Sequence, residues 1–178
     1  IADQAEFVIQ DNGQIRQAGA TTPEGAWVLQ QKHLAESNLF VFARTILGLS
    51  RLTLNLHLPV CHFLMRIPPY RKLVLLPRDH LKTSIISRSL PIHLLIQPQE
   101  NNLYFPGLIG TTTRILLANE KAEHAINQLR WIKHHFESNQ LLRAFLPQVC
   151  WENPKRESPK WAEIAITVPR PIAYPEAS

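Results

Sequence analysis

One stretch decides the fold expected from this sequence: Lys72-Leu-Val-Leu-Leu-Pro-Arg-Asp-His-Leu-Lys-Thr-Ser84. Its apolar run, Leu73–Leu76, is typical of a strand buried on both faces of a parallel sheet. Pro77 ends the run because it has no N–H to give to a ladder. From Leu81 the apolar residues recur at helical spacing. The stretch therefore predicts a buried strand, a tight loop and the first turn of a helix.

The junction of loop and helix carries Lys82-Thr83-Ser84, which points to phosphate chemistry. In a P-loop, backbone N–H groups and a helix N-terminus face the phosphates, the lysine neutralises charge and the hydroxyl binds magnesium. The match to G-x-x-x-x-G-K-[ST] is partial, because Leu76 and Leu81 occupy the glycine positions. An amphipathic helix that merely starts with Lys-Thr is the alternative. Arg78 favours the phosphate site, because a second cation in the loop is useful beside an anion.

These residues give a candidate site for a nucleotide and Mg²⁺. We expect Lys82 and Arg78 to act on the phosphates during catalysis, and Thr83 to bind the metal. The expected nucleotide-binding residues are Arg78, Asp79, His80, Leu81, Lys82, Thr83 and Ser84.

Charge around this stretch is strongly one-sided. Between Ser37 and Gln99 the only acidic residue is Asp79, whereas the chain as a whole has a net charge of +5. A field of one sign concentrates polyphosphates or nucleic acid. The eight basic residues of the stretch are Arg44, Arg51, Arg66, Arg71, Lys72, Arg78, Lys82 and Arg88.

Length and composition bound the class of protein. A chain of 178 residues with 45% hydrophobic residues predicts one globular domain. No apolar run approaches the roughly 18 residues that span a membrane, so we expect a soluble protein. Two cysteines, Cys61 and Cys150, suit a reducing compartment. The chain begins with Ile1, which indicates a fragment or a processed product.

Helices are expected before and after the central stretch. The first runs from Thr22-Pro23-Glu24 to about Glu36. A second, capped by Ser37 or Asn38, ends at Gly48, and a third spans Leu58 to Met65. Further along, we expect a helix from Leu81 to Gln97, kinked at Pro91, a long loop over 98–112, and a helix capped by Asn119 with the apolar face Ala122, Ile126, Leu129, Ile132 and Phe136.

Two more apolar runs, Arg114–Ala118 and Glu163–Val168, predict strands. Strands separated by helices imply an α/β fold with a mostly parallel sheet. We therefore expect a three-layer, P-loop NTPase-like fold that is incomplete, with helices preceding it. Residues 1–21 are expected to form an N-terminal arm, and 22–178 the N-terminal part of an ATPase domain.

The nearest resemblance to a metal cluster is His57, Cys61 and His62. His57 and Cys61 are four residues apart, but no second pair of ligands follows, so we interpret them as packing residues. The pair His134-His135 is a weaker candidate, because adjacent helical residues point in different directions.

From about Pro23 onward, the chain resembles the N-terminal ATPase region of the large terminase subunit of tailed bacteriophages. The likeness rests mainly on the strand Val74–Leu76 followed by Pro77-Arg-Asp-His-Leu-Lys-Thr83, since terminases often carry a loop with a basic residue upstream of Lys-Thr. Other similar stretches are Asn38-Leu-Phe40, Leu47-Gly48, Arg114–Glu120 and Lys160-Trp161.

The resemblance implies an ATP- and magnesium-dependent motor that moves double-stranded DNA into a capsid. It implies a homo-oligomeric ring as well, with the portal or procapsid and the small terminase subunit as partners, and the cytoplasm of an infected bacterium as location. The acidic strand end that such an ATPase needs is missing, because Asn119 stands where a carboxylate should follow Ile115–Ala118. We read Glu120 as an acid in the first turn of a helix.

Two other classes are open from the residues. A non-enzymatic, basic DNA-binding or capsid-associated module would explain the charge without a nucleotide. A helicase-like P-loop ATPase of another family would share the loop, and only downstream motifs would distinguish it.

Overall fold

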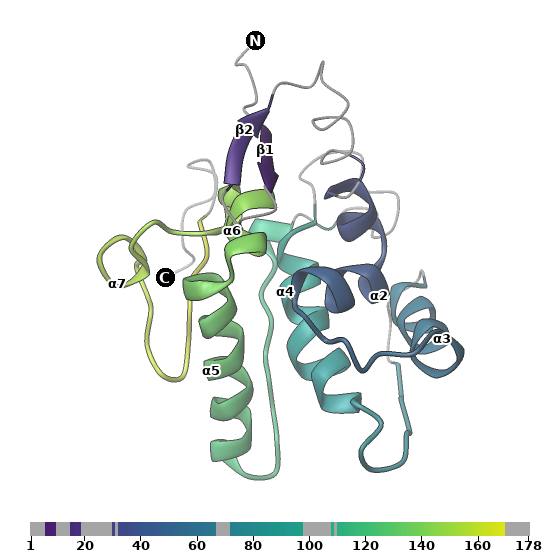
Figure 1. The fold of residues 1–178 in the computed structure, drawn as a ribbon. Helices are drawn as coiled ribbons and strands as arrows, with labels where there is room; N and C mark the ends of the chain where they lie inside the picture. Colours follow the sequence, from purple (N-terminus) through teal and green to yellow (C-terminus); the bar gives the residue numbers. More distant parts are fainter. Residues whose placement is uncertain are drawn as a thin grey trace.

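Helices form most of the part of the chain that the structure describes (Figure 1). This computed structural model describes residues 6–9, 15–18, 30, 32–66, 72–97, 108 and 110–169, and residues 32–37 are helical. Two further segments, η1 and η2, are π-helical, and η3 and η4 are 3-10 turns. The elements are β1 (Glu6–Ile9), β2 (Ile15–Ala18), α2 (Leu39–Val41), η1 (Phe42–Ile46), α3 (Leu54–Met65), η2 (Ser84–Ser89), α4 (Leu90–Leu95), η3 (Gly110–Thr112), α5 (Ala122–Ser138), α6 (Gln140–Phe145), η4 (Pro147–Val149) and α7 (Pro154–Glu157).

The predicted α/β fold with a mostly parallel sheet is wrong for the described residues. Their sheet has two strands, β1 and β2, which pair antiparallel with Glu6 opposite Ala18. None of the three predicted strands, 73–76, 114–118 and 163–168, lies in a sheet. The third makes a single bridge, between Trp161 and Ile166.

The run 73–76 does not form the predicted strand because no other described segment is hydrogen-bonded to its backbone. Residues 72–77 and 114–119 run as non-helical chains on either side of the helix formed by η2 and α4 (Figure 1). Within the described residues, no backbone hydrogen bond joins 72–77 to another segment. A strand can satisfy its N–H and C=O groups only through a neighbour, so an apolar run without one is not buried on both faces. Leu73 and Leu75 are accordingly 76% and 80% exposed, although the sequence predicted burial on both faces.

The start of α2 confirms a predicted cap. The side chain of Asn38 accepts hydrogen bonds from the N–H groups of Phe40 and Val41, at 3.0 and 3.2 Å. Gly48 ends this helical stretch at a φ of +70°, the conformation that favours glycine at a helix C-terminus. The first predicted helix, from Thr22, lies mostly outside the described residues.

A continuous helical run from Lys82 to Leu95 confirms the predicted helix around Pro91. The run is π-helical in η2, where the Leu90 N–H donates to the carbonyl of Ile85. Pro91 has no N–H, and the hydrogen-bonding pattern changes to α4 there. The Ser89 hydroxyl donates to the carbonyl of Ser84 over 2.8 Å, which adds a bond across the π-helical turn.

The core lies between this run and the helices around it. Side chains from α2, η1, α5 and α6 are buried against it, and α5 contacts η2 directly. Of the face predicted for α5, Ile132 and Phe136 are buried, whereas Ala122 is exposed. Fully buried members of the core are Leu39, Phe42, Ile85, Ile92, Ile96, Leu142 and Leu146.

Two buried polar residues tie helix 32–37 to α4. The His93 Nε2–H donates to the carbonyl of Ala35 over 3.1 Å, and the Gln97 amide donates to the carbonyl of Glu36 over 3.0 Å. Burial lowers the pKa of His93 to about 4, although the backbone hydrogen bonds act in the opposite direction. His93 is therefore neutral in the folded protein at neutral pH.

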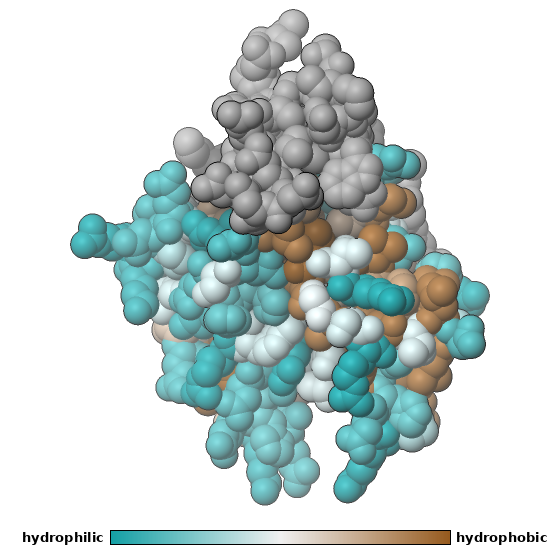
Figure 2. Space-filling view, in the orientation of Figure 1, coloured by the Kyte–Doolittle hydropathy of each residue, from teal (hydrophilic) through white to brown (hydrophobic). Residues whose placement is uncertain are grey.

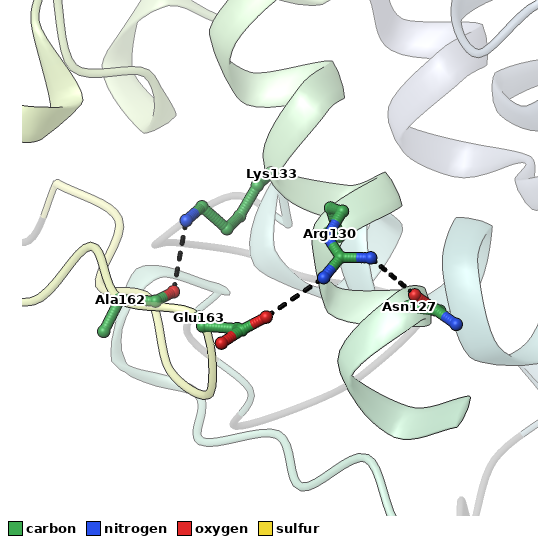
Figure 3. A network of polar contacts seen from close by, with 5 residues as sticks. All are labelled: Asn127, Arg130, Lys133, Ala162 and Glu163. Carbon is green, nitrogen blue, oxygen red and sulfur yellow. Dashed lines mark hydrogen bonds and ion pairs between the residues drawn. The ribbon is translucent and has the colours of Figure 1, made fainter. Parts of the chain in front are cut away.

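The chain after α7 folds back onto α5 (Figure 3). Lys133 donates to the carbonyl of Ala162 over 3.1 Å, and Arg130 forms an ion pair with Glu163 at 3.0 Å. Trp161 adds a hydrogen bond to Glu137 over 2.7 Å. The Arg130–Glu163 pair is exposed, and such pairs contribute little to stability.

Helix α3 begins four residues earlier than predicted and contains Pro59. It buries His57 and Cys61, as expected of packing residues, and burial raises the pKa of the Cys61 thiol to about 12. No helix in the described ranges is long and apolar enough to cross a membrane.

Candidate functional site

The segment Pro77–Ser84, here called the basic loop, runs from the end of the extended chain 72–77 into the first residues of the helical run, which begins at Lys82. Two of its residues, Asp79 and Leu81, have positive φ angles of 63° and 51°. Such a conformation costs a residue such as Leu81 about 1–2 kcal/mol, whereas Asp adopts it more readily than most residues other than glycine. Backbone that alternates in handedness turns successive N–H groups toward one side, which is how many anion sites are formed.

Side chains within the basic loop hold this conformation. The Nδ1–H of His80 donates to the carbonyl of Arg78 over 2.7 Å, so the proton of a neutral His80 ring is on Nδ1. Leu81 is half-buried against the core, and its carbonyl accepts the N–H of Ile85 over 2.9 Å. Leu81 thus fixes the first helical turn to the body of the protein.

The two cations of the basic loop are free to bind an anion. Arg78 and Lys82 are exposed, and neither forms an ion pair within the described residues, where Arg130–Glu163 is the one ion pair. Thr83 is exposed at the helix start and caps no backbone group with its side chain. The hydrophilic surface in Figure 2 includes the region of this loop, whereas apolar side chains gather over α2 and α3.

Other basic residues of the stretch have structural contacts. The Lys72 ammonium donates to the carbonyls of Leu64 and Arg66, at 2.5 and 2.7 Å, and so binds the C-terminal end of α3. Burial and the neighbouring Arg66 lower the pKa of Lys72. The eight basic residues are therefore not equivalent, because the Lys72 ammonium is already bonded to the end of α3 and is not a candidate for binding a ligand.

For magnesium, the described residues offer Thr83 but no carboxylate cluster. No group of three or more His, Cys, Asp or Glu side chains lies close enough to hold a metal within these ranges. Asn119 and Glu120 are exposed at the end of the segment 114–119, and α5 begins only at Ala122. Asn119 is therefore not the helix cap that the sequence predicted, although its side chain accepts the N–H of Lys121 at 3.4 Å.

A cavity in the described part of the chain lies away from the basic loop. It has a volume of about 580 Å³ and lies between α4, α5, residues 113–119 and residues 164–168, with no residue of the basic loop in its lining. Its walls are mainly aliphatic, with Leu95, Leu117, Leu129 and Ile166 among them. An aliphatic lining of this kind provides no acid–base chemistry, so the basic loop is the better candidate for a functional site.

Sequence reasoning missed a second polar cluster, which links η2 to α5. Arg88 donates from Nε to the side-chain oxygen of Gln128 over 2.6 Å, and its guanidinium lies 5.2 Å from the ring centre of Trp131. The ring of Trp131 in turn contacts the ring of His135, with ring centres 4.0 Å apart and the planes tilted by 51°. The spacing of Gln128, Trp131 and His135 along one helix was the available signal, but nothing in the sequence places Arg88 opposite them.

Comparison with known protein families, with curated proteins and with solved structures finds no match to this chain.

Proposed function

We propose that the basic loop binds the phosphates of ATP, and that the chain is the ATP-binding part of a motor that packages double-stranded DNA. The observation that carries the proposal is the strained loop, with positive φ at Asp79 and Leu81 and with Arg78 and Lys82 lacking ion-pair partners in the described region. Strain of this kind is commonly kept where it serves a function. The resemblance to large terminases adds the motor and the DNA.

The residues of the loop fit a phosphate group better than they fit a metal. Lys82 and Arg78 would neutralise phosphate charge, and the backbone N–H groups around His80 would donate to phosphate oxygens. The Thr83 hydroxyl would supply one magnesium ligand. Bound ATP would supply the free energy for movement of DNA, and the loop residues would hold and orient its phosphates.

Binding of ATP with magnesium, measured by calorimetry, tests this assignment. We expect Lys82→Ala and Arg78→Ala each to weaken binding about tenfold or more, because a hydrogen bond to a charged group contributes about 1.5–3 kcal/mol. Arg51→Ala is the matched control, since Arg51 is an exposed cation of the same basic stretch. Equal affinities for the Lys82→Ala, Arg51→Ala and unchanged proteins would contradict the proposal.

The same variants distinguish the proposed motor from a DNA-binding module that uses no nucleotide. Such a module predicts that DNA affinity is independent of ATP, and that Lys82→Ala and Arg51→Ala weaken DNA binding to the same degree. A motor predicts that ATP changes the affinity for duplex DNA, and that Lys82→Ala removes this dependence.

A further inference from the structure

Arg88 is a cation that the fold holds firmly but does not neutralise. It is half-buried, with its Nε bonded to Gln128 and its guanidinium against the ring of Trp131. In the part of the chain that the structure describes, no carboxylate pairs with it and its two terminal nitrogens have no acceptor. Because a half-buried charge without a counter-ion is costly, such a site favours an anion from outside.

His135 lies on the same aromatic platform as Arg88, and its protonation can be assigned. The side-chain oxygen of Asn139 accepts the N–H of Leu142 over 2.9 Å, so the amide nitrogen faces the other way. That nitrogen lies 2.7 Å from the carbonyl of Ile46 and 2.8 Å from the Nδ1 of His135. Nδ1 is therefore the acceptor, and Nε2 carries the proton of the neutral ring.

The pKa of His135 is lowered by its surroundings. Burial, the neighbouring His134 and the charge of Arg88 together lower its pKa to about 4. His135 is therefore neutral at neutral pH, and Arg88 is a charged neighbour that has no ion-pair partner among the described residues.

We propose that Arg88 and His135 form a binding site for a single phosphate group, separate from the basic loop. The terminal nitrogens of Arg88 present a planar fork that suits two oxygens of a tetrahedral oxyanion. His135 also contacts Trp131, with ring centres 4.0 Å apart, and its Nε2–H would be a third donor. A free nucleotide and the backbone of a nucleic acid both carry such a group, and the sources are distinguished below.

The test uses the pKa of His135 as its readout, measured by NMR of the imidazole nitrogens. Sulfate is the first probe, because it keeps two negative charges over the pH range of the titration, and sodium chloride of equal ionic strength is the reference. Sulfate should raise the pKa of His135 by about one pH unit or more, because a bound anion stabilises the imidazolium form. His124, which is exposed on α5, serves as the internal control and should not change.

Three variants make the test specific. Arg88→Gln should abolish the effect of sulfate on His135, whereas Arg51→Gln should leave it unchanged. Arg88→Lys keeps the charge without the fork, and we expect a smaller rise than in the unchanged protein. Equal titration curves in sulfate and chloride, or an undiminished effect in Arg88→Gln, would overturn the proposal.

ATP and a short DNA duplex then replace sulfate in the unchanged protein. The ligand that raises the pKa of His135 at the lower concentration is the source of the phosphate group. A rise with sulfate but with neither ATP nor DNA would overturn the assignment to phosphate. Because Lys82→Ala leaves Arg88 in place, the response of His135 persists in that variant even if nucleotide binding by the basic loop fails.

Discussion

Large apolar side chains are buried in the helical core but exposed in the extended segments. In the core, Phe42 and Ile92 are completely buried. In the segments 72–77 and 114–119, Leu75 is 80% and Leu116 89% exposed. Both regions are rich in aliphatic residues, so hydrophobicity alone does not decide which side chains leave water.

Backbone hydrogen bonding accounts for the difference. A helix satisfies its own N–H and C=O groups and needs only one covered face, whereas a strand needs a neighbour before burial is possible. η2 and α4 therefore pack against α5 and η3. The chain before η2 reaches the same body of the protein but buries only alternate residues, among them Val74.

The largest effect should come from truncating the helical core. Phe42→Ala should lower the free energy of unfolding by about 3–5 kcal/mol, because it leaves a cavity in a close-packed site. Leu116→Ala is the control and should change it by less than about 0.5 kcal/mol. Denaturation by urea measures both, and a cost above about 2 kcal/mol for Leu116→Ala would mean that the extended segment is packed.

Acid should weaken the helical region through His93. The pKa of His93 is about 4 in the folded protein and 6.5 in the unfolded chain. Above pH 6.5 His93 is neutral in both states, and it costs the folded protein no stability. As the pH falls from 6.5 to 4, the unfolded chain binds a proton that the folded chain does not, and about 3 kcal/mol is lost. Denaturation by urea across this range should show a flatter pH dependence for His93→Gln, and an unchanged slope would refute the role of His93.

Asp79 offers a smaller test, at the boundary of the two regions. Asp79 has a φ of 63°, which glycine adopts without strain and alanine does not. The free energy of unfolding should therefore be about 1 kcal/mol higher for the Asp79→Gly variant than for the Asp79→Ala variant. Thermal unfolding of the two variants measures the difference directly. Equal melting temperatures would show that the basic loop relaxes to an ordinary conformation once the carboxylate is removed.

Leu73 and Leu75 should affect stability least. Replacing both with serine should leave the unfolding free energy within about 0.5 kcal/mol, because both side chains are already in water. The same change should reduce self-association in ultracentrifugation, since an exposed apolar edge is prone to pairing. Val74→Ser is the control, and it should destabilise the protein because Val74 packs against the core.

Features set by local chemistry were predictable from the sequence. The cap at Asn38, the glycine at position 48 and the buried face at Ile132 and Phe136 each depend on a few adjacent residues. The hairpin of β1 and β2 was missed, although the dipeptide Asn12-Gly13 between its strands is a typical hairpin signal.

Features that depend on distant residues were not predictable. A run such as Leu73–Leu76 shows that a segment is apolar, but a strand forms only if another segment lies beside it. In the candidate site, the sequence pointed to Lys82 and Arg78 but could not show that Lys72 binds the end of α3. Nor could it place Arg88 against Trp131, because that contact joins two helices 40 or more residues apart.

The π-helical segment η2 is equivalent to one extra residue inserted into an α-helix. Removal of a single residue, such as Ser87, would let the run from Lys82 to Leu95 return to α-helical hydrogen bonding. Each residue of an α-helix turns the chain by about 100°, so Lys82 and Thr83 would then face more than a quarter turn away from their present direction relative to α4. The orientation of the basic loop therefore depends on the residue count of the helix behind it, and a one-residue deletion there could redirect the loop without altering its sequence.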